Sequence, residues 1–330
     1  MNKKIFFVIG ILFFLITSCK QEVKKEKGIT EETKLEGFVF GTTYHITYLD
    51  KADYQKSIDS LFHLVNKSLS TYMPTSDISK INKGDTTVVV DDLFVEVFEK
   101  SKRIYKETDG FFDPTVCGLV NAWGFGYKKE KRDLDSIQVK ELMTEVGLDK
   151  VVLDGRMVKK QFAKSCLDFN SIAKGYGIDV IGRFLESKNV ANYLVEIGGE
   201  IRAKGKSSRG AYWKVAIDDP NADGTRSVSR FIELHNQSMA SSGNYRKFRV
   251  GKNGQKYVHT INPKTGFATE SNLLAATVYG AVDCADVDAY ATAFMAMGLE
   301  KAKMFLQENT KIKAMLLYVD KDGKIAQFSN

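Results

Sequence analysis

Two hydrophobic periodicities occur along this chain, and they follow one another in no regular order. Residues 53–69 place apolar side chains three and four positions apart, which is the spacing of one face of an α-helix. Residues 35–49 instead alternate β-branched and aromatic side chains around Gly41, which is typical of a strand with a close backbone approach at the glycine. Because helices and strands mix without a repeated strand–helix–strand unit, the sequence predicts an α+β fold rather than a doubly wound sheet.

The same two patterns assign most of the remaining chain. A well-capped helix is predicted to start at Asp91 or Asp92 and to stop at Asp109-Gly110. Further helices are predicted at residues 172–185, 286–297 and 299–308. Strands are predicted at residues 158–169, 193–205, 212–218, 228–235, 245–262 and 272–280, followed by a hairpin turn at residues 320–323. No repeat and no Ser/Gly/Pro-rich linker interrupts this body, and 330 residues allow one large domain or two ordinary ones.

The composition and charge exclude several classes of protein. With 43% hydrophobic residues, 27% charged residues and only four prolines, the chain is neither collagen, nor disordered, nor a polytopic membrane protein. The formal net charge is +7, but no stripe of Lys and Arg interleaved with aromatic residues accompanies it, so no nucleic-acid partner is predicted. The cysteines form no CxxC pair and no short repeat, so neither a zinc site nor a disulfide framework is predicted. They are Cys19, Cys117, Cys166 and Cys284.

The first 19 residues have the layout of a secretory signal, with two lysines, an apolar run from Ile5 to Ile16, and then Thr17-Ser18-Cys19. As a helix this run would be about 18 Å long, too short for a hydrocarbon core of roughly 30 Å. A stable transmembrane helix is the other interpretation. The segment from Ile16 to Cys19 resembles the bacterial lipobox, whose cysteine is diacylated and becomes the new N-terminus. Several acyl chains together anchor a protein durably.

We therefore expect residues 1–18 to be a lipoprotein signal peptide and residues 19–34 a lipidated, flexible tether, because residues 20–34 are polar and lack hydrophobic periodicity. Residues 35–330 form the expected folded domain. The mature protein would be lipid-anchored through Cys19 to a bacterial membrane, facing the periplasm or another extracytoplasmic space.

The common catalytic motifs are missing from the sequence, which has no Walker A loop, GxGxxG turn, HExxH or GxSxG. One pair is more informative. Asp288 and Thr292 lie four residues apart on the predicted helix at 286–297, so a carboxylate and a hydroxyl share one face. Two such oxygen donors suit Mg²⁺. The alternative is a solvated Asp beside a core Thr, and the nearby Asp283 and Asp286 leave open which carboxylate coordinates.

Eight segments, in order over about 260 residues, resemble the ApbE family of FAD:protein FMN transferases. They are Phe40-Gly41-Thr42-Thr43-Tyr44; Leu69-Ser70-Thr71-Tyr72; Phe112-Asp113-Pro114-Thr115-Val116, running on to Trp123-Gly124-Phe125-Gly126; Leu167-Asp168 with Ile172-Ala173-Lys174-Gly175-Tyr176; Gly198-Gly199-Glu200-Ile201; Ser241-Ser242-Gly243-Asn244-Tyr245-Arg246; His259 with Ile261-Asn262-Pro263-Lys264-Thr265-Gly266; and Asp288 with Thr292. The resemblance implies a single α+β body of mixed helices and β-sheet with FAD in a central cleft.

The resemblance also implies roles for individual residues. Mg²⁺ would be held by Asp288, the Thr292 hydroxyl and the backbone carbonyl of Ser171. His259 is the expected general base, because it directly precedes a cofactor-lining motif and histidine titrates near neutral pH; the alternative is a hydrogen-bonded histidine at a strand end. Flavin and adenine contacts would come from Phe40, Tyr72, Phe111, Phe112, Asp113, Asp168, Lys174 and Ile261. Phe40 stands where the family often has Met, and both side chains can pack against a ring.

The implied reaction is a Mg²⁺-dependent transfer of the FMN part of FAD to a Thr or Ser hydroxyl of an acceptor protein, which releases AMP. The expected acceptors carry a short Ser/Thr flavinylation motif and belong to membrane electron-transport complexes. Two alternatives stay open from the sequence: hydrolysis of FAD to FMN and AMP, and a flavin-binding lipoprotein without catalysis.

Overall fold

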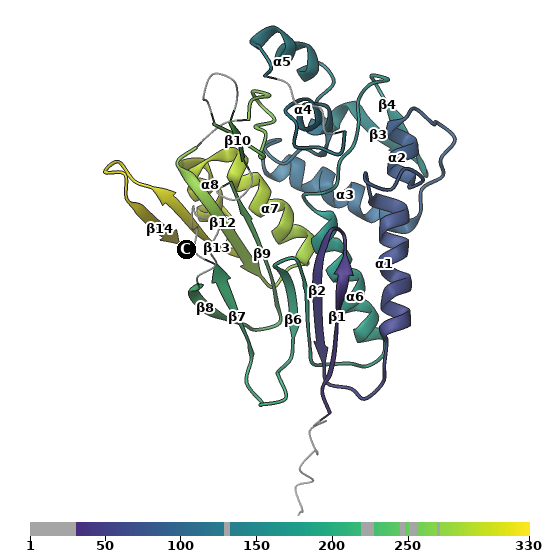
Figure 1. Ribbon diagram of the computed structural model, residues 1–330, viewed down its shortest axis with the longest axis vertical. Coiled ribbons are helices and arrows are strands. Elements are labelled where there is room, and N and C mark those ends of the chain that lie inside the picture. Colours follow the sequence, from purple (N-terminus) through teal and green to yellow (C-terminus); the bar gives the residue numbers. More distant parts are fainter. Residues whose placement is uncertain (1–30, 129–132, 219–227, 245–247, 251–255, 269–270) are drawn as a thin grey trace, which may run out of the picture.

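An antiparallel sheet of eight strands forms the centre of the fold (Figure 1). The computed structural model describes residues 31–128, 133–218, 228–244, 248–250, 256–268 and 271–330. The strands lie in the spatial order β1 (Thr33–Val39), β2 (Thr42–Tyr48), β5 (Tyr193–Ile197), β6 (Glu200–Lys204), β9 (Gln237–Gly243), β12 (Leu273–Gly280), β13 (Ile312–Val319) and β14 (Ile325–Ser329).

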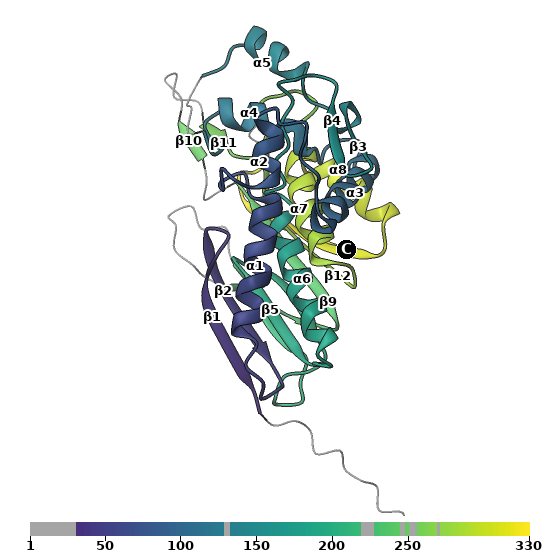
Figure 2. The same cartoon turned by 90° about the vertical axis from the view of Figure 1, so that its right-hand side faces the viewer.

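Helices cover one face of this sheet, and a hairpin covers part of the other. On the helical face, α6 lies against β5 and β6, α7 lies against β9 and β12, and α1 packs outside α6 (Figure 2). The bounds of these helices are α1 (Gln55–Leu69), α6 (Ala173–Ser187) and α7 (Cys284–Met297). On the opposite face, β7 (Trp213–Asp218) and β8 (Val228–Leu234) enclose a smaller apolar core that includes Ile201 and Met239.

Most of the remaining elements lie toward the upper end of the sheet in Figure 1, and one further helix packs against β13. They are α2 (Asp77–Asn82), α3 (Asp92–Glu107), η1 (Pro114–Val116), α4 (Cys117–Ala122), α5 (Ser136–Met143), η2 (Leu148–Lys150), β3 (Val151–Asp154), β4 (Met157–Lys160), β10 (Phe248–Val250), β11 (Lys256–Val258) and α8 (Leu299–Glu308). A second core around Trp123 and Val139 holds α4 and α5 to the segment that contains Ile261.

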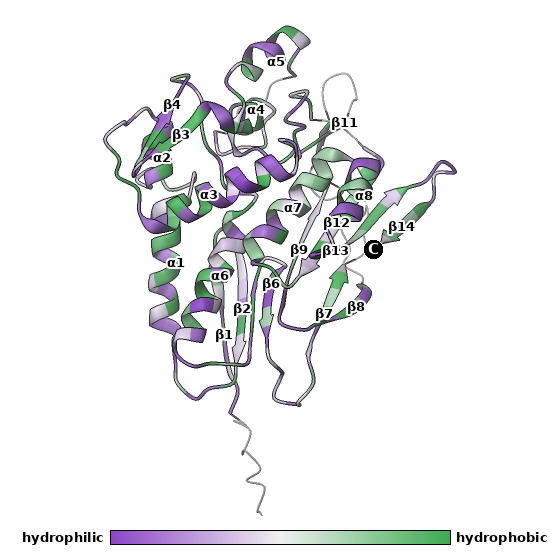
Figure 3. Ribbon diagram, turned by 180° about the vertical axis from the view of Figure 1, so that it is seen from behind, coloured by the Kyte–Doolittle hydropathy of each residue, from purple (hydrophilic) through white to green (hydrophobic). Residues whose placement is uncertain are grey.

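Hydropathy distinguishes a helix at the surface of the fold, α1, from a helix in its interior, α7. In Figure 3, hydrophilic and hydrophobic residues are mixed along the α1 ribbon, whereas most of the α7 ribbon is paler. Helix α1 is exposed on one side. Helix α7 reads CADVDAYATAFMAM, and nearly all of its residues are buried. Its many alanines allow other backbones to approach closely, which a helix with larger side chains would prevent. Within the described residues, no helix is long and apolar enough to cross a membrane.

Several predicted elements are confirmed with small shifts at their ends. Helix α3 is capped by Asp91, whose side chain accepts the backbone N–H of Phe94, and α8 matches the predicted helix at 299–308. The predicted strand at 35–49 divides into the hairpin β1–β2 at Phe40 and Gly41, which have φ of 50° and 80°. Strand β1 begins at Thr33, two residues before the predicted folded domain. Cys19 and most of the predicted tether lie outside the described residues.

The predicted strand at 158–169 is wrong beyond Lys160, and the reason is local. Leu167 and Phe169 are buried and alternate with more exposed neighbours, as in a strand. The hydrogen-bonding partner of the Leu167 backbone, however, is a side chain: Asn82 donates to the Leu167 carbonyl at 2.7 Å and accepts the Leu167 N–H at 2.8 Å. The predicted strand at 245–262 is confirmed only in part, because within the described residues it contains two short antiparallel strands, β10 and β11, and not one continuous strand.

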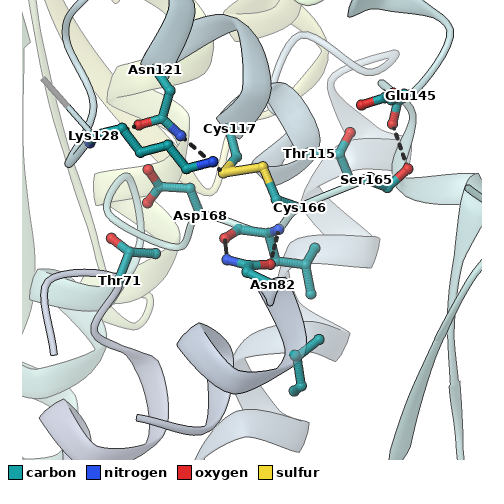
Figure 4. The surroundings of a disulfide bond; sticks show 12 residues. Thr71, Asn82, Thr115, Cys117, Asn121, Lys128, Glu145, Ser165, Cys166 and Asp168 are labelled. Carbon is teal, nitrogen blue, oxygen red and sulfur yellow. Dashed lines mark hydrogen bonds between the residues drawn. A yellow bond between two sulfur atoms is a disulfide. The ribbon is translucent and has the colours of Figure 1, made fainter. Parts of the chain in front are cut away.

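The expectation that no cysteines pair is wrong. Cys117 and Cys166 form a disulfide with a Cα–Cα distance of 5.7 Å (Figure 4). Cys284 is free and buried. The two bonded residues are 49 positions apart, a separation that carries no spacing signature. The disulfide joins the start of α4 to the loop that leads to Asp168, beside the hydrogen bond from the Asp168 N–H to the Pro114 carbonyl.

Removing this disulfide should destabilise the fold. For a loop of 49 residues, chain entropy predicts a loss of about 4 kcal/mol in the free energy of unfolding for the double variant Cys117→Ser/Cys166→Ser. Denaturant unfolding with and without a thiol reductant measures the loss. The reductant should destabilise the wild-type protein and leave the double variant unchanged. Equal unfolding midpoints for the oxidised wild-type protein and the double variant would contradict a stabilising role.

Candidate functional site

Helices α6 and α7 meet closely at the carboxylate of Asp288. Its Oδ2 accepts the backbone N–H of Gly175, in the first turn of α6, at 3.0 Å. A Cβ atom at residue 175 would lie 2.4 Å from the carbonyl oxygen of Cys284, so only glycine allows the two backbones to approach this closely. Asp288 is 6% exposed. The carboxylate predicted from the sequence as a metal ligand is therefore held in place by the backbone of a second helix.

Lys174 and Glu200 complete a charged cluster around Asp288. The Lys174 Nζ lies 2.6 Å from Oε2 of Glu200, whose side chain is 4% exposed. Burial raises the pKa values of Glu200 and Asp288, and the nearby Lys174 opposes both shifts. Burial alone would lower the pKa of Lys174, but the two carboxylates raise it above its ordinary value. One ammonium group thus lies near two buried carboxylates and opposes the effect of burial on both.

The other carboxylates of α7 are already paired. Asp283 contacts Lys100, Arg183 and Arg202. Asp286 lies 2.7 Å from Arg103 and 3.3 Å from Lys100. Asp288 instead turns toward α6 and Lys174, and its assignment as the metal ligand stays a prediction.

The oxygen atoms offered by Asp288, Thr292 and Ser171 fit a hard divalent cation. Thr292 is one turn after Asp288 on α7 and is partly exposed, while Ser171 lies two residues before α6 begins. The close contact at Gly175 brings the start of α6 to this part of α7. A carboxylate, a hydroxyl and a carbonyl are all oxygen donors, as Mg²⁺ prefers. The described residues contain no group of three His, Cys, Asp or Glu side chains that could hold a metal ion, so an ion here would need these other oxygens.

Aromatic side chains and a carboxylate form a second group. The rings of Tyr72 and Tyr127 meet edge to face with centroids 6.5 Å apart, and Tyr72 is 62% exposed. Partial burial and the Asp168 carboxylate raise the pKa values of both phenols, so Asp168 lies near both rings. An exposed aromatic surface beside a carboxylate can stack on a heterocycle and accept hydrogen bonds from its edge.

The predicted segment 111–113 is more internal than the sequence suggests. The Phe111 ring lies under the ammonium groups of Lys301, at 4.5 Å, and Lys264, at 5.7 Å. The Phe112 side chain belongs to the main core. Asp113 caps η1 by accepting the N–H and the hydroxyl of Thr115, and burial raises its pKa to about 6 although these hydrogen bonds oppose the shift.

Phe40, His259 and Ile261 lie on three further segments. The Phe40 ring contacts Phe62 and fills the space beside Gly177, where a Cβ atom would lie 2.5 Å from that ring. His259 follows β11 and is partly buried, and Ile261 belongs to the second core. A pocket of about 120 Å³ lies between this segment and the end of α7. It is lined by Thr260, Asn262, Ser271, Met295, Ala296, Met297 and Gly298.

Comparison with known proteins decides the family. The model of the ApbE family matches residues 40–316. The chain belongs to the ApbE family. Over 336 residues it is 34% identical to the FAD:protein FMN transferase of Haemophilus influenzae, covering 97% of this chain and 94% of that protein.

Solved ApbE structures have the same fold. The flavin transferase ApbE from Vibrio cholerae matches with a TM-score of 0.81 at 32% identity, over 91% of this chain and 97% of that chain. The apo form of the Pseudomonas stutzeri flavinyl transferase ApbE also matches with a TM-score of 0.81, at 28% identity over 91% and 95% of the two chains. The α+β fold, the single body and the resemblance read from the eight segments are confirmed.

Two residues of this ApbE-family site were not assigned a role from the sequence. Glu200 follows the Gly198-Gly199 turn. An acidic residue directly before a buried position of a strand is the sequence signal that could have indicated its role. Tyr127 follows the Trp-Gly-Phe-Gly segment without any periodic pattern, so only the fold brings it to Tyr72. Tyr245 and Arg246 of the predicted motif lie outside the described residues.

Proposed function

We propose that this chain transfers the FMN part of FAD to a Ser or Thr hydroxyl of an acceptor protein and releases AMP. The observation that carries the proposal is the buried cluster of Asp288, Lys174 and Glu200 where α6 meets α7. The similarity to the FAD:protein FMN transferase of Haemophilus influenzae and to the flavin transferase ApbE of Vibrio cholerae supports it. The acceptor oxygen would form a new bond to the FMN phosphorus, the bond from this phosphorus to the bridging oxygen would break, and AMP would leave with that oxygen.

The residues present suit this reaction. Asp288, Thr292 and the Ser171 carbonyl would hold Mg²⁺, which when bound neutralises charge on the pyrophosphate. Lys174 keeps its proton because of its two carboxylate neighbours, and it can therefore stabilise phosphate oxygens. Tyr72 and Asp168 would orient the cofactor rings, together with Phe40 and the segments that contain Phe111, Phe112, Asp113 and Ile261.

His259 is the proposed base that accepts the proton of the acceptor hydroxyl. A positioned base contributes about 10² to 10⁴ to the rate of such a step. We expect His259→Ala to lower the rate constant of FMN transfer within this range while the dissociation constant for FAD changes little. Single-turnover kinetics and fluorescence titration with FAD measure the two quantities. A loss of FAD affinity equal to the loss of rate would instead make His259 a binding residue.

The transferase proposal is separable from hydrolysis and from flavin storage. The chain is incubated with FAD and Mg²⁺, with and without an acceptor protein, and flavin fluorescence is read in a denaturing gel while AMP is measured by chromatography. Transfer predicts a fluorescent acceptor band and AMP release that requires the acceptor. AMP release without any labelled band would indicate a hydrolase, and neither signal would indicate a storage protein.

We also propose that the chain is a lipoprotein anchored through Cys19 and facing an extracytoplasmic space, where its acceptors are subunits of membrane electron-transport complexes with a Ser/Thr flavinylation motif. The lipobox-like segment supports this location. The disulfide is consistent with it, because disulfides persist mainly outside the reducing cytoplasm. Labelling with a palmitate analogue should mark the wild-type chain and not Cys19→Ala, and equal labelling would contradict the anchor.

A further inference from the structure

A second carboxylate joins α6 to α7, and the proposed reaction does not use it directly. Asp179 lies on α6, one turn after Gly175, and its side chain is fully buried. Its Oδ1 accepts the backbone N–H of Cys284 at 2.9 Å, and its Oδ2 accepts the N–H of Ala285 at 2.8 Å. These are the first two residues of α7, whose N–H groups have no partner within their own helix.

Asp179 takes the place of the usual capping residue. The residue that precedes α7 is Asp283, and its side chain makes no capping hydrogen bond. The Asp283 carboxylate instead binds Lys100, Arg183 and Arg202. The cap of α7 is thus supplied by a neighbouring helix, so the position of α7 depends on α6.

The two helices exchange carboxylates in both directions. Asp179 of α6 binds the first N–H groups of α7, and Asp288 of α7 binds the N–H of Gly175 on α6. Within each helix, the accepting carboxylate and the backbone N–H that donates to the other helix lie about one turn apart. Two contacts separated along both axes fix the sliding and the rotation of α7 on α6, which a single contact would not.

Arg202 on β6 makes this arrangement possible in the interior. Its guanidinium lies 2.6 Å from Asp179 and 2.9 Å from Asp283. A buried carboxylate without a compensating charge would be strongly unfavourable. Arg202 also connects α6 and α7 to the central sheet, so the two helices are held in a fixed place in the fold.

We propose that Asp179 is a positioning residue for the metal site, because it holds α7 at the register that brings Asp288 and Thr292 to the start of α6. This inference rests on the proposed function, which assigns these residues to Mg²⁺. The contacts of the Asp179 carboxylate are with Cys284, Ala285 and Arg202, so the proposal gives it a role that acts through α7. Residues that orient metal ligands in this way typically change metal affinity by 10- to 100-fold when they are replaced.

The test compares Asp179→Ala and Asp179→Asn with Asp283→Asn in the full chain. Asparagine keeps the shape of Asp179 but offers one acceptor oxygen in place of two, and alanine offers none. Asp283→Asn is the matched control, since it removes a carboxylate from the same Arg202 network without touching the α7 N–H groups. The measured quantities are the Mg²⁺ concentration for half-maximal transfer, Mg²⁺ binding to the FAD-loaded protein by calorimetry, and FAD affinity.

We expect Asp179→Ala to raise the half-maximal Mg²⁺ concentration by about 10- to 100-fold, Asp179→Asn to raise it less, and Asp283→Asn to leave it unchanged. FAD affinity should change little in all three. If Asp179→Ala does not fold, Asp179→Asn is compared with Asp283→Asn in its place. An equal Mg²⁺ requirement in the Asp179 variants and the control would overturn the proposal.

Hydrogen exchange gives a readout that does not depend on activity. The amides of Cys284 and Ala285 should lose protection in Asp179→Ala and keep it in Asp283→Asn. Unchanged protection in the alanine variant would also overturn the proposal. A wild-type chain that neither transfers FMN nor binds Mg²⁺ with FAD would refute the proposed function instead, and the wild-type measurement therefore separates the two failures.

Discussion

Asp288→Ala is expected to abolish Mg²⁺-dependent FMN transfer, with a fall in rate of at least about 10³-fold. A metal ion that neutralises charge on a phosphoryl group contributes several kcal/mol to the transition state, and each 1.36 kcal/mol corresponds to about tenfold in rate. Asp288 is the only carboxylate among the three proposed ligands, so no other ligand carries a negative charge to hold the ion. The rate of acceptor flavinylation as a function of Mg²⁺ concentration measures the effect.

The matched control for this variant is Asp286→Asn. Asp286 lies on the same helix two residues earlier and is also largely buried, but it pairs with Arg103 and Lys100 rather than facing α6. We expect this variant to keep the Mg²⁺ requirement of the wild-type protein. Undiminished transfer by Asp288→Ala, or an equal loss in both variants, would refute Asp288 as the metal ligand.

Lys174→Met should produce the second large effect, on stability as well as on transfer. The substitution leaves two buried carboxylates, Glu200 and Asp288, without their shared cation. Breaking a buried ion pair by removing one partner typically costs about 3–5 kcal/mol in the free energy of unfolding. Because the Lys174 side chain is still 31% exposed, we expect a value of about 3 kcal/mol, at the lower end of this range.

A double-mutant cycle with Glu200→Gln isolates the charge effect. Glutamine has the shape of glutamate without its charge, so Lys174→Met/Glu200→Gln should recover part of the stability that Lys174→Met loses. Urea unfolding of the four proteins gives the coupling energy between the two positions. Additive effects of the two substitutions would mean that the ion pair does not account for the loss.

The sequence predicts the helices of this protein better than its strands. A helix such as α8 depends on side chains within a few positions of one another, so its bounds follow from local spacing. The segment around Leu167 has the alternating burial of a strand, but it pairs with the Asn82 side chain, which is 85 residues away in the chain. No local pattern can indicate such a partner.

In the candidate site, too, some residues are indicated by local spacing and others only by partners that are distant in the sequence. The Asp288 and Thr292 pair is visible from the sequence because both residues lie on one helix. Glu200 joins the site from a strand and Asp179 acts from another helix, so their partners become apparent only in the fold. The Cys117–Cys166 disulfide likewise depends on the start of α4 and a loop that the fold brings together from positions 49 residues apart.

The central claim is that this chain moves FMN from FAD to a protein hydroxyl, and mass spectrometry of an acceptor tests it most directly. An acceptor protein with a Ser/Thr flavinylation motif is incubated with the chain, FAD and Mg²⁺, in parallel with Asp288→Ala. We predict that the wild-type chain adds the mass of FMN less water to one Ser or Thr of the acceptor, and that the variant adds nothing. An unmodified acceptor in the presence of the wild-type chain, whether FAD is left intact or hydrolysed to FMN and AMP, would contradict the claim.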